Sequence, residues 1–89
     1  MTEDEFRKQV TAKGYGEPRV KEFTPNLNSD MHEHEFALFG LVTRGTLTLG
    51  FNGGAESVYV AGECCELPAG TVHSERTGSD GATFLIATR

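Results

Sequence analysis

Beyond residue 18, large apolar side chains recur at every second position in several short runs. In TLTLGF at residues 46–51, leucine or phenylalanine alternates with threonine or glycine, and in VYV at residues 58–60 two valines flank a tyrosine. A period of two is that of a β-strand with one buried face. Glycine or proline interrupts the chain at Pro25, Gly45, Gly53, Gly54, Gly62, Pro68, Gly70, Gly78 and Gly81. This spacing predicts an antiparallel β-sandwich or barrel of about seven to nine strands.

The start of the chain has a helical pattern instead. Thr2 and Glu5 have the spacing of a capping box, in which each side chain satisfies the backbone N–H of the other residue. Phe6 and Val10 follow four positions apart, and Gly14 is a typical residue just after a helix end. We therefore predict one short helix that ends before Gly14 and packs its apolar stripe on the rest of the molecule.

One predicted turn sets the direction of the side chains around it. Arg44 and Gly45 separate two apolar runs and have the form of a two-residue hairpin turn. Such a turn pairs Val42 with Leu47, and directly opposed residues share a face. Even-numbered positions before the turn then point inward. The predicted core consists of Val42, Leu47, Leu49, Phe51, Leu67 and Leu85.

Phe39 and Leu41 fall on the outward side of the same strand. Two large apolar side chains on one patch seldom face water. We expect that either the N-terminal helix or a second subunit covers them.

Length and charge limit the class of protein. With 89 residues, the chain is expected to form a single domain, with the helix in residues 1–14 and the barrel in residues 15–89. The net charge of −5 without a basic cluster argues against nucleic acid as a partner. There is no long apolar run and no signal-like N-terminus, so we expect a cytoplasmic protein that does not enter a membrane. Cys64 and Cys65 are adjacent and are expected to be reduced thiols.

The three histidines are candidates for a metal site. His32 and His34 share a face if their segment is extended, and the predicted turn places that face inward. Buried imidazoles need partners for their polar nitrogens. A shared divalent metal ion would provide one, but water or carboxylates at a cavity mouth would serve equally well. The spacing of His32 and His34 alone does not decide between these alternatives.

His73 completes a longer motif. It follows Gly62, five residues, Pro68, one residue, Gly70 and two residues. Together with the earlier His-x-His and Gly45, this motif strongly resembles the cupin superfamily, and the short helix before a compact barrel resembles the small stand-alone bacterial cupins of the cupin-2 type. The resemblance implies an antiparallel jelly-roll β-barrel with a metal at its centre.

The resemblance also implies a ligand set. His32, His34 and His73 carry over as metal ligands, whereas the family's glutamate, seven residues before Gly45, is Leu38 here. The expected cofactor is a divalent transition metal ion, namely Fe, Ni, Zn, Cu or Mn. Without the carboxylate, the metal would be more electrophilic and would favour a small anionic ligand. The family also has an asparagine four residues after the last histidine, and this position is Thr77 here.

Other side chains are expected around this centre. The candidates for the cavity lining are Leu38, Phe36, Phe51 and Cys65. Glu75 and Arg76 are candidates for its mouth, although ordinary surface charge is the favoured interpretation of both. Glu33 and Glu35 should point outward.

Three alternatives remain open at this point. Three-histidine sites in cupins resemble those of thiol, diketone and gentisate-type dioxygenases, so the protein could be an oxygenase or another metal-dependent enzyme acting on a small anionic molecule. It could equally be a non-catalytic module that binds or senses a metal or a small ligand, or a barrel that has lost metal affinity. No residue is assigned a catalytic role. Cupins commonly pair, so we expect a homodimer.

Overall fold

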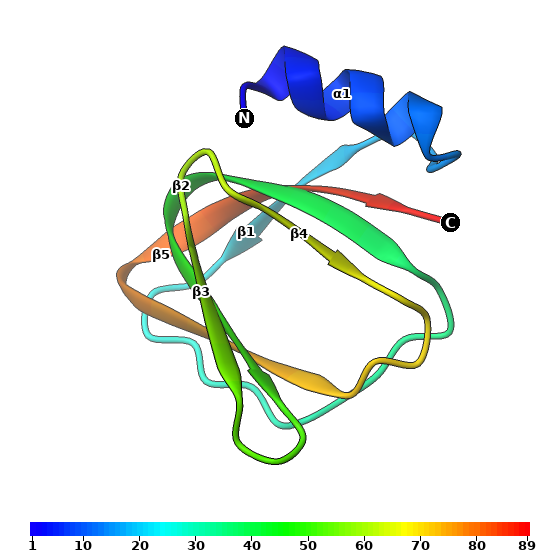
Figure 1. Cartoon of the computed structure of the whole chain (residues 1–89). Coiled ribbons are helices and arrows are strands. Elements are labelled where there is room, and N and C mark those ends of the chain that lie inside the picture. The colour runs from blue at the N-terminus through cyan, green and yellow to red at the C-terminus, as the bar shows by residue number, and fades with distance from the viewer.

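The computed structural model describes all residues of the chain, 1–89. It contains one helix and five strands, all paired antiparallel in the order β1-β5-β2-β3, with β4 also paired to β2 (Figure 1). The elements are α1 (Glu3–Ala12), β1 (Arg19–Phe23), β2 (Leu38–Phe51), β3 (Glu56–Val60), β4 (Cys64–Leu67) and β5 (His73–Thr88). This is the predicted architecture of a small antiparallel jelly-roll barrel with one short N-terminal helix.

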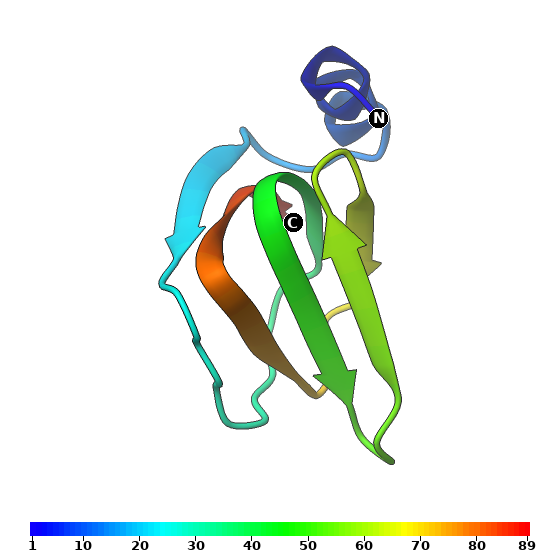
Figure 2. The same cartoon turned by 90° about the vertical axis from the view of Figure 1, so that its left-hand side faces the viewer.

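Two long, bent strands hold the barrel together. β2 and β5 pair along nearly their whole length, from Leu38 opposite Thr88 to Phe51 opposite His73. The first part of β2 also pairs with β4, and its second part pairs with β3. Both long strands therefore take part in two layers, which curl toward each other, as Figure 2 shows from the side.

The predicted hairpin turn at Arg44 and Gly45 is wrong. Both residues lie inside β2, opposite Thr83 and Ala82 of β5. Thr43 has no partner in β5, so the strand contains a β-bulge there. Glycine at a positive φ, here +79°, suits a bulge as well as a turn. β2 and β5 continue through glycines, such as Gly45 and Gly81, that the sequence pattern suggested as strand ends. The fold therefore has five strands and not seven to nine.

The bulge explains why most of the predicted core is nevertheless correct. One extra residue moves the inward positions of β2 from even to odd numbers, which is the same change that a two-residue turn would produce. Nine buried residues form the inner core. They are Phe23, Leu38, Val42, Leu47, Leu49, Cys65, Leu67, Ala82 and Phe84. Phe51 is partly buried against this cluster.

Leu85 is an exception among the predicted core residues, because it faces outward to the layer under α1. Residues 78–81 of β5 lie opposite the single residue Thr46, which changes the inward positions of β5 to even numbers. Leu85 therefore belongs to the second buried cluster, between the barrel and the helix. That cluster consists of Phe6, Val10, Tyr15, Phe39, Leu41, Leu85 and Ala87.

The helix forms and packs as the sequence predicts. The capping box between Thr2 and Glu5 is present, and Phe6 and Val10 are buried. The ring of Phe6 lies 4.9 Å from that of Phe39, between ring centroids. Since α1 covers Phe39 and Leu41, these residues give no support to a subunit interface. The homodimer stays a prediction that rests on the resemblance alone.

α1 has ten residues, and no helix in the structure has the length and hydrophobicity needed to cross a bilayer.

Candidate metal centre

The segment before β2 is positioned by backbone pairing with the start of β5. The N–H of His32 donates to the carbonyl oxygen of His73 (2.8 Å), and the N–H of His73 donates back to that of His32 (2.9 Å). Gly70 also donates its N–H to the carbonyl of His34 (2.9 Å). This segment is not a regular strand, but its backbone hydrogen bonds hold it beside β5 in the way that a paired strand is held. The rings of His32 and His73 therefore lie side by side, with centroids 4.6 Å apart.

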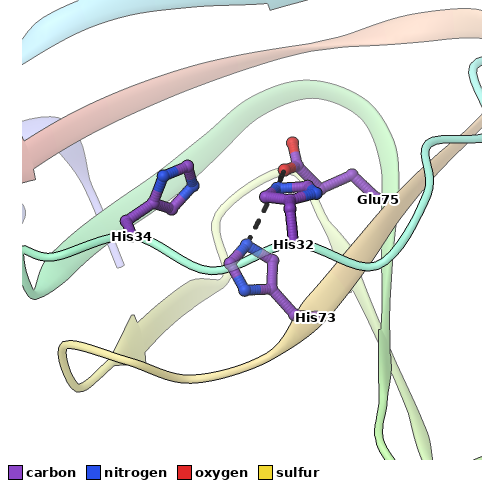
Figure 3. Close-up of side chains that lie close together, drawn as sticks. All are labelled: His32, His34, His73 and Glu75. Carbon is purple, nitrogen blue, oxygen red and sulfur yellow. Dashed lines mark hydrogen bonds and ion pairs between the residues drawn. The ribbon is translucent and has the colours of Figure 1, made fainter.

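Four side chains converge at this point. His34 joins the pair with its ring centroid 5.1 Å from that of His32 and 5.4 Å from that of His73. Glu75 lies two residues after His73 on the same face of β5, and its carboxylate points to His32 and His73 (Figure 3). One ligand atom from each of the four residues lies within 4.8 Å of all the others. Such a group can hold a metal ion.

Burial differs across the four ligand candidates. The side chain of His73 is 3% exposed and that of Glu75 is 13% exposed, whereas that of His32 is 32% exposed. His34 is also partly exposed. The cluster therefore connects the barrel interior with solvent on the side of His32 and His34.

Backbone carbonyls orient two of the rings. Nδ1 of His32 lies 2.8 Å from the carbonyl oxygen of Asp30, and Nδ1 of His73 lies 2.8 Å from that of Thr71. A carbonyl oxygen can only accept, so both Nδ1 atoms carry a hydrogen. Nε2 of each ring is then the nitrogen that is free to bind a metal. This arrangement is typical of metal-ligating histidines, whose second nitrogen donates to a carbonyl or a carboxylate.

The contact between His32 and Glu75 shows what the cluster requires. Nε2 of His32 lies 2.7 Å from Oε1 of Glu75, and Nε2 of His73 lies 3.7 Å from the same oxygen. In a neutral His32 ring with its hydrogen on Nδ1, Nε2 and Oε1 are both acceptors and repel each other. A proton on either atom makes this contact an ordinary hydrogen bond at 2.7 Å, and a metal ion bound by both atoms would also relieve the repulsion. Imidazole nitrogens and a carboxylate are suitable ligands for divalent transition metals.

His34 is favoured in its neutral form. Desolvation lowers the pKa of His34, and the neighbouring His32 and His73 lower it further. A neutral imidazole is the form that binds metal.

Comparison with known proteins identifies the fold. No protein-family profile and no curated protein sequence matches the chain. Among solved structures, a cupin-2 domain protein from Shewanella frigidimarina matches with a TM-score of 0.63 and 19% identity, over 90% of this chain and 89% of that one. A cupin superfamily protein from Desulfitobacterium hafniense matches with a TM-score of 0.66 and 17% identity, over 78% of this chain and 62% of that one. The chain has the cupin fold.

A third similar structure is described under the DMSP lyases RdDddP and RnDddQII, and it matches with a TM-score of 0.70 and 23% identity. It covers 79% of this chain, but the present chain spans only 36% of its length. At this level of identity, the likeness concerns the fold.

The carboxylate of the cluster comes from a position that the sequence did not predict. Leu38 occupies the place of the usual glutamate, is 6% exposed and forms part of an apolar wall. Glu75 supplies a carboxylate from β5 instead, and it lies within the cluster and not at a mouth as predicted. The cluster therefore contains a carboxylate in addition to the three predicted histidines. The spacing of Glu75 from His73 equals that of His34 from His32, so the period-two rule could have found it.

The other predicted mouth residue, Arg76, lies away from the site. Next to Glu75 on β5, it points to the opposite face and forms an ion pair with Glu56 of β3 at the surface. Arg76 therefore has no place in the cluster.

A small cavity of about 30 Å³ lies beside the cluster inside the barrel. Eight of its twelve lining residues are hydrophobic, including the predicted Leu38 and Cys65. Phe36 and Phe51 do not line the cavity: the ring of Phe36 stacks on that of His34, and Phe51 packs against the inner core. Burial raises the pKa of Cys65 to about 12, so its thiol is neutral and forms part of the wall.

Proposed function

We propose that this cupin binds a divalent transition metal ion through His32, His34, His73 and Glu75. The observation that supports this function best is the convergence of three imidazole nitrogens and one carboxylate oxygen, all within 4.8 Å of one another. When bound, the ion would supply Lewis acidity toward a small ligand.

The charge and size of the site define the kind of ligand. Glu75 neutralises one of the two positive charges of a divalent ion, so the loaded centre still attracts an anion. A cavity of about 30 Å³ has room for roughly two water-sized groups. Only a small part of a ligand, such as a carboxylate, fits inside. The proposed function is therefore a metal centre for a small anionic molecule.

Two versions of this function differ in chemistry. In the first, the protein is a metal-dependent enzyme, of the oxygenase kind that the cupin resemblance suggests. In the second, it is a non-catalytic module that holds a small ligand, which the narrow cavity favours. O₂ consumption by the metal-loaded protein, measured against a panel of thiols, diketones and phenolic acids, distinguishes the two. Turnover of any member supports the enzyme.

Replacement of Glu75 tests the metal site itself. We expect Glu75→Gln to lower the affinity for Zn²⁺ or Co²⁺ about tenfold or more, because an amide is a weaker ligand than a carboxylate. Titration calorimetry measures the affinity, and elemental analysis of protein purified without added metal measures the native content. Glu33→Gln is the matched control, since Glu33 is exposed beside the cluster.

Two results would contradict the proposal in different ways. If wild-type protein takes up no stoichiometric Zn²⁺ or Co²⁺, the metal function is wrong. If Glu75→Gln and Glu33→Gln have the same small effect, the metal is bound without Glu75.

A further inference from the structure

Lys21 is the remaining polar residue of the cavity wall once the cluster is set aside. Apart from the eight hydrophobic residues, the cavity is lined by His34, His73, Glu75 and Lys21. Lys21 lies on β1, two residues before the buried Phe23, so both side chains are on the same face of the strand. Since Lys21 is exposed and Phe23 is buried, Lys21 marks the solvent end of the cavity.

The ammonium group of Lys21 is positioned but unpaired. Its Nζ lies 5.2 Å from the ring centroid of Phe23, a cation–π contact that holds the side chain over the cavity wall. Lys21 takes part in none of the six ion pairs of the structure. A positive charge at a cavity opening, without a protein carboxylate as partner, is available to a ligand.

The charge of Lys21 is close enough to act on the cluster. Lys21 lines the same small cavity as His34, His73 and Glu75, so its charge and the cluster face the same enclosed space. Lys21 and a bound metal ion would therefore act together on an anion that enters the cavity.

From this geometry we infer that Lys21 is the residue that selects an anionic group, of the size of a carboxylate, on the ligand of the metal centre. This inference rests on the proposed function and adds the residue that sets the charge preference. The small cavity admits the anionic group of the ligand, while the rest of the molecule stays outside.

The charges on the other side of His34 have the opposite sign. Glu33 and Glu35 line a separate open hollow with His34, Ala69 and Gly70. These two carboxylates are exposed and lie outside the inner cavity. The charged side chains of the inner cavity itself are Lys21 and Glu75, and with a divalent ion to balance Glu75, Lys21 adds a further positive charge for a ligand.

Anion binding to the Co²⁺-loaded protein tests the inference. The visible spectrum of Co²⁺ changes when a ligand joins its coordination shell, so formate can be titrated at constant ionic strength. We expect Lys21→Gln to weaken formate binding about fivefold, the effect of losing one partly exposed charge pair. Lys21→Arg should retain most of the affinity. The Co²⁺ affinity, measured separately, should stay within about twofold of wild type in both variants.

Two controls separate charge from structure. Lys8→Gln removes the same charge from the exposed side of α1 and should leave formate binding unchanged. Formamide, a neutral probe of similar size, should bind Lys21→Gln and wild type equally well.

The possible contrary results are distinct. If Lys21→Gln holds Co²⁺ and binds formate as tightly as wild type, the inference is wrong and the metal function stands. If formate and formamide weaken equally, Lys21 has a structural role and the inference is wrong. If wild type holds no Co²⁺, the proposed function fails, and the inference fails with it.

Discussion

Glu75 and Leu38 show how single residues shape the centre. Leu38 stands where the cupin motif has a glutamate, and it supplies apolar wall. Glu75, two residues after His73, brings a carboxylate to the same cluster from a different strand. The cluster therefore has one carboxylate, which β5 supplies, although the motif position on β2 is a leucine.

Cys64 and Cys65 illustrate the effect of strand geometry on neighbouring residues. Cys65 lies in the inner core, whereas Cys64 packs at the outer cluster under α1. Adjacent residues on β4 point to opposite faces, so the two thiols are directed apart. Both cysteines are free in the structure.

At pH 8 we expect Cys64 to react with a thiol reagent faster than Cys65, although burial raises the pKa of Cys64 as well, and we expect Cys65 to react only after unfolding. Cys64 is partly exposed, while Cys65 is 5% exposed and its pKa is raised to about 12 by burial. Timed labelling with mass spectrometry measures the difference. Rapid modification of Cys65 in the folded protein would show that the barrel opens there.

The raised pKa of Cys65 also predicts that the stability of the protein depends on pH. Because the folded-state pKa of Cys65 lies above its ordinary value of 9.0, the unfolded chain loses this proton first as the pH rises. The contribution of the thiol to stability is fully present below pH 9 and declines between about pH 9 and 12. In urea unfolding, Cys65→Ala should show a smaller decline than wild type over that range.

Among the elements, β2 decides the shape of the barrel. Its bulge near Gly45 lets one continuous strand serve both layers, and it sets which residues enter the core. Gly45 has φ +79°, and a Cβ there would collide with the carbonyl oxygen of Gly81. Gly53, in the loop after β2, has φ +88° but has open space around it.

These two glycines provide a matched pair of variants. Gly53→Ala should cost about 1–2 kcal/mol, the strain of a positive φ alone. Gly45→Ala should cost more, because the neighbouring backbone must also move. For a domain of this size, each kcal/mol lowers Tm by about 4–8 °C, so thermal unfolding resolves the difference. Equal losses would show that the contact with Gly81 does not constrain the bulge.

At the scale of the whole molecule, two buried layers stabilise a small protein. The inner core fills the barrel and surrounds the cavity, and the outer cluster joins α1 to the back of β2 and β5. Tyr15 and Lys13 extend this contact, since both bind the carboxylate of Glu66 on β4, at 2.7 and 3.0 Å. The helix therefore completes the fold by covering Phe39 and Leu41.

Removal of the helix anchor should be costly. Phe6 is fully buried, so Phe6→Ala is expected to lower the free energy of unfolding by about 3–5 kcal/mol. Val20→Ala is the control, because Val20 is 66% exposed and should change stability by less than about 0.5 kcal/mol. Urea unfolding measures both. A loss for Phe6→Ala no larger than that of the control would mean that α1 is not part of the cooperative fold.

Much of this protein follows from short-range patterns in its sequence. The capping box of Thr2 and Glu5 predicts the helix, and the period of two predicts strands, because both depend on residues a few positions apart. The motif spacing of the three histidines led to the cluster and to the cupin fold. The face occupied by Phe39 and Leu41 was also readable, although whether the helix or a second subunit covers it was not.

The tertiary structure decided the features that depend on pairing between distant segments. The bulge in β2 and a two-residue turn have the same local signature, and only the continuous pairing with β5 distinguishes them. The change of the inward-facing positions of β5 from odd to even numbers, which places Leu85 on the outer face, also depends on the pairing with β2. Glu75 joined the cluster because backbone bonds bring His32 beside His73, 41 positions away in the sequence. Local rules set the direction of a side chain relative to its own strand, and only the folded chain determines which side chains meet it there.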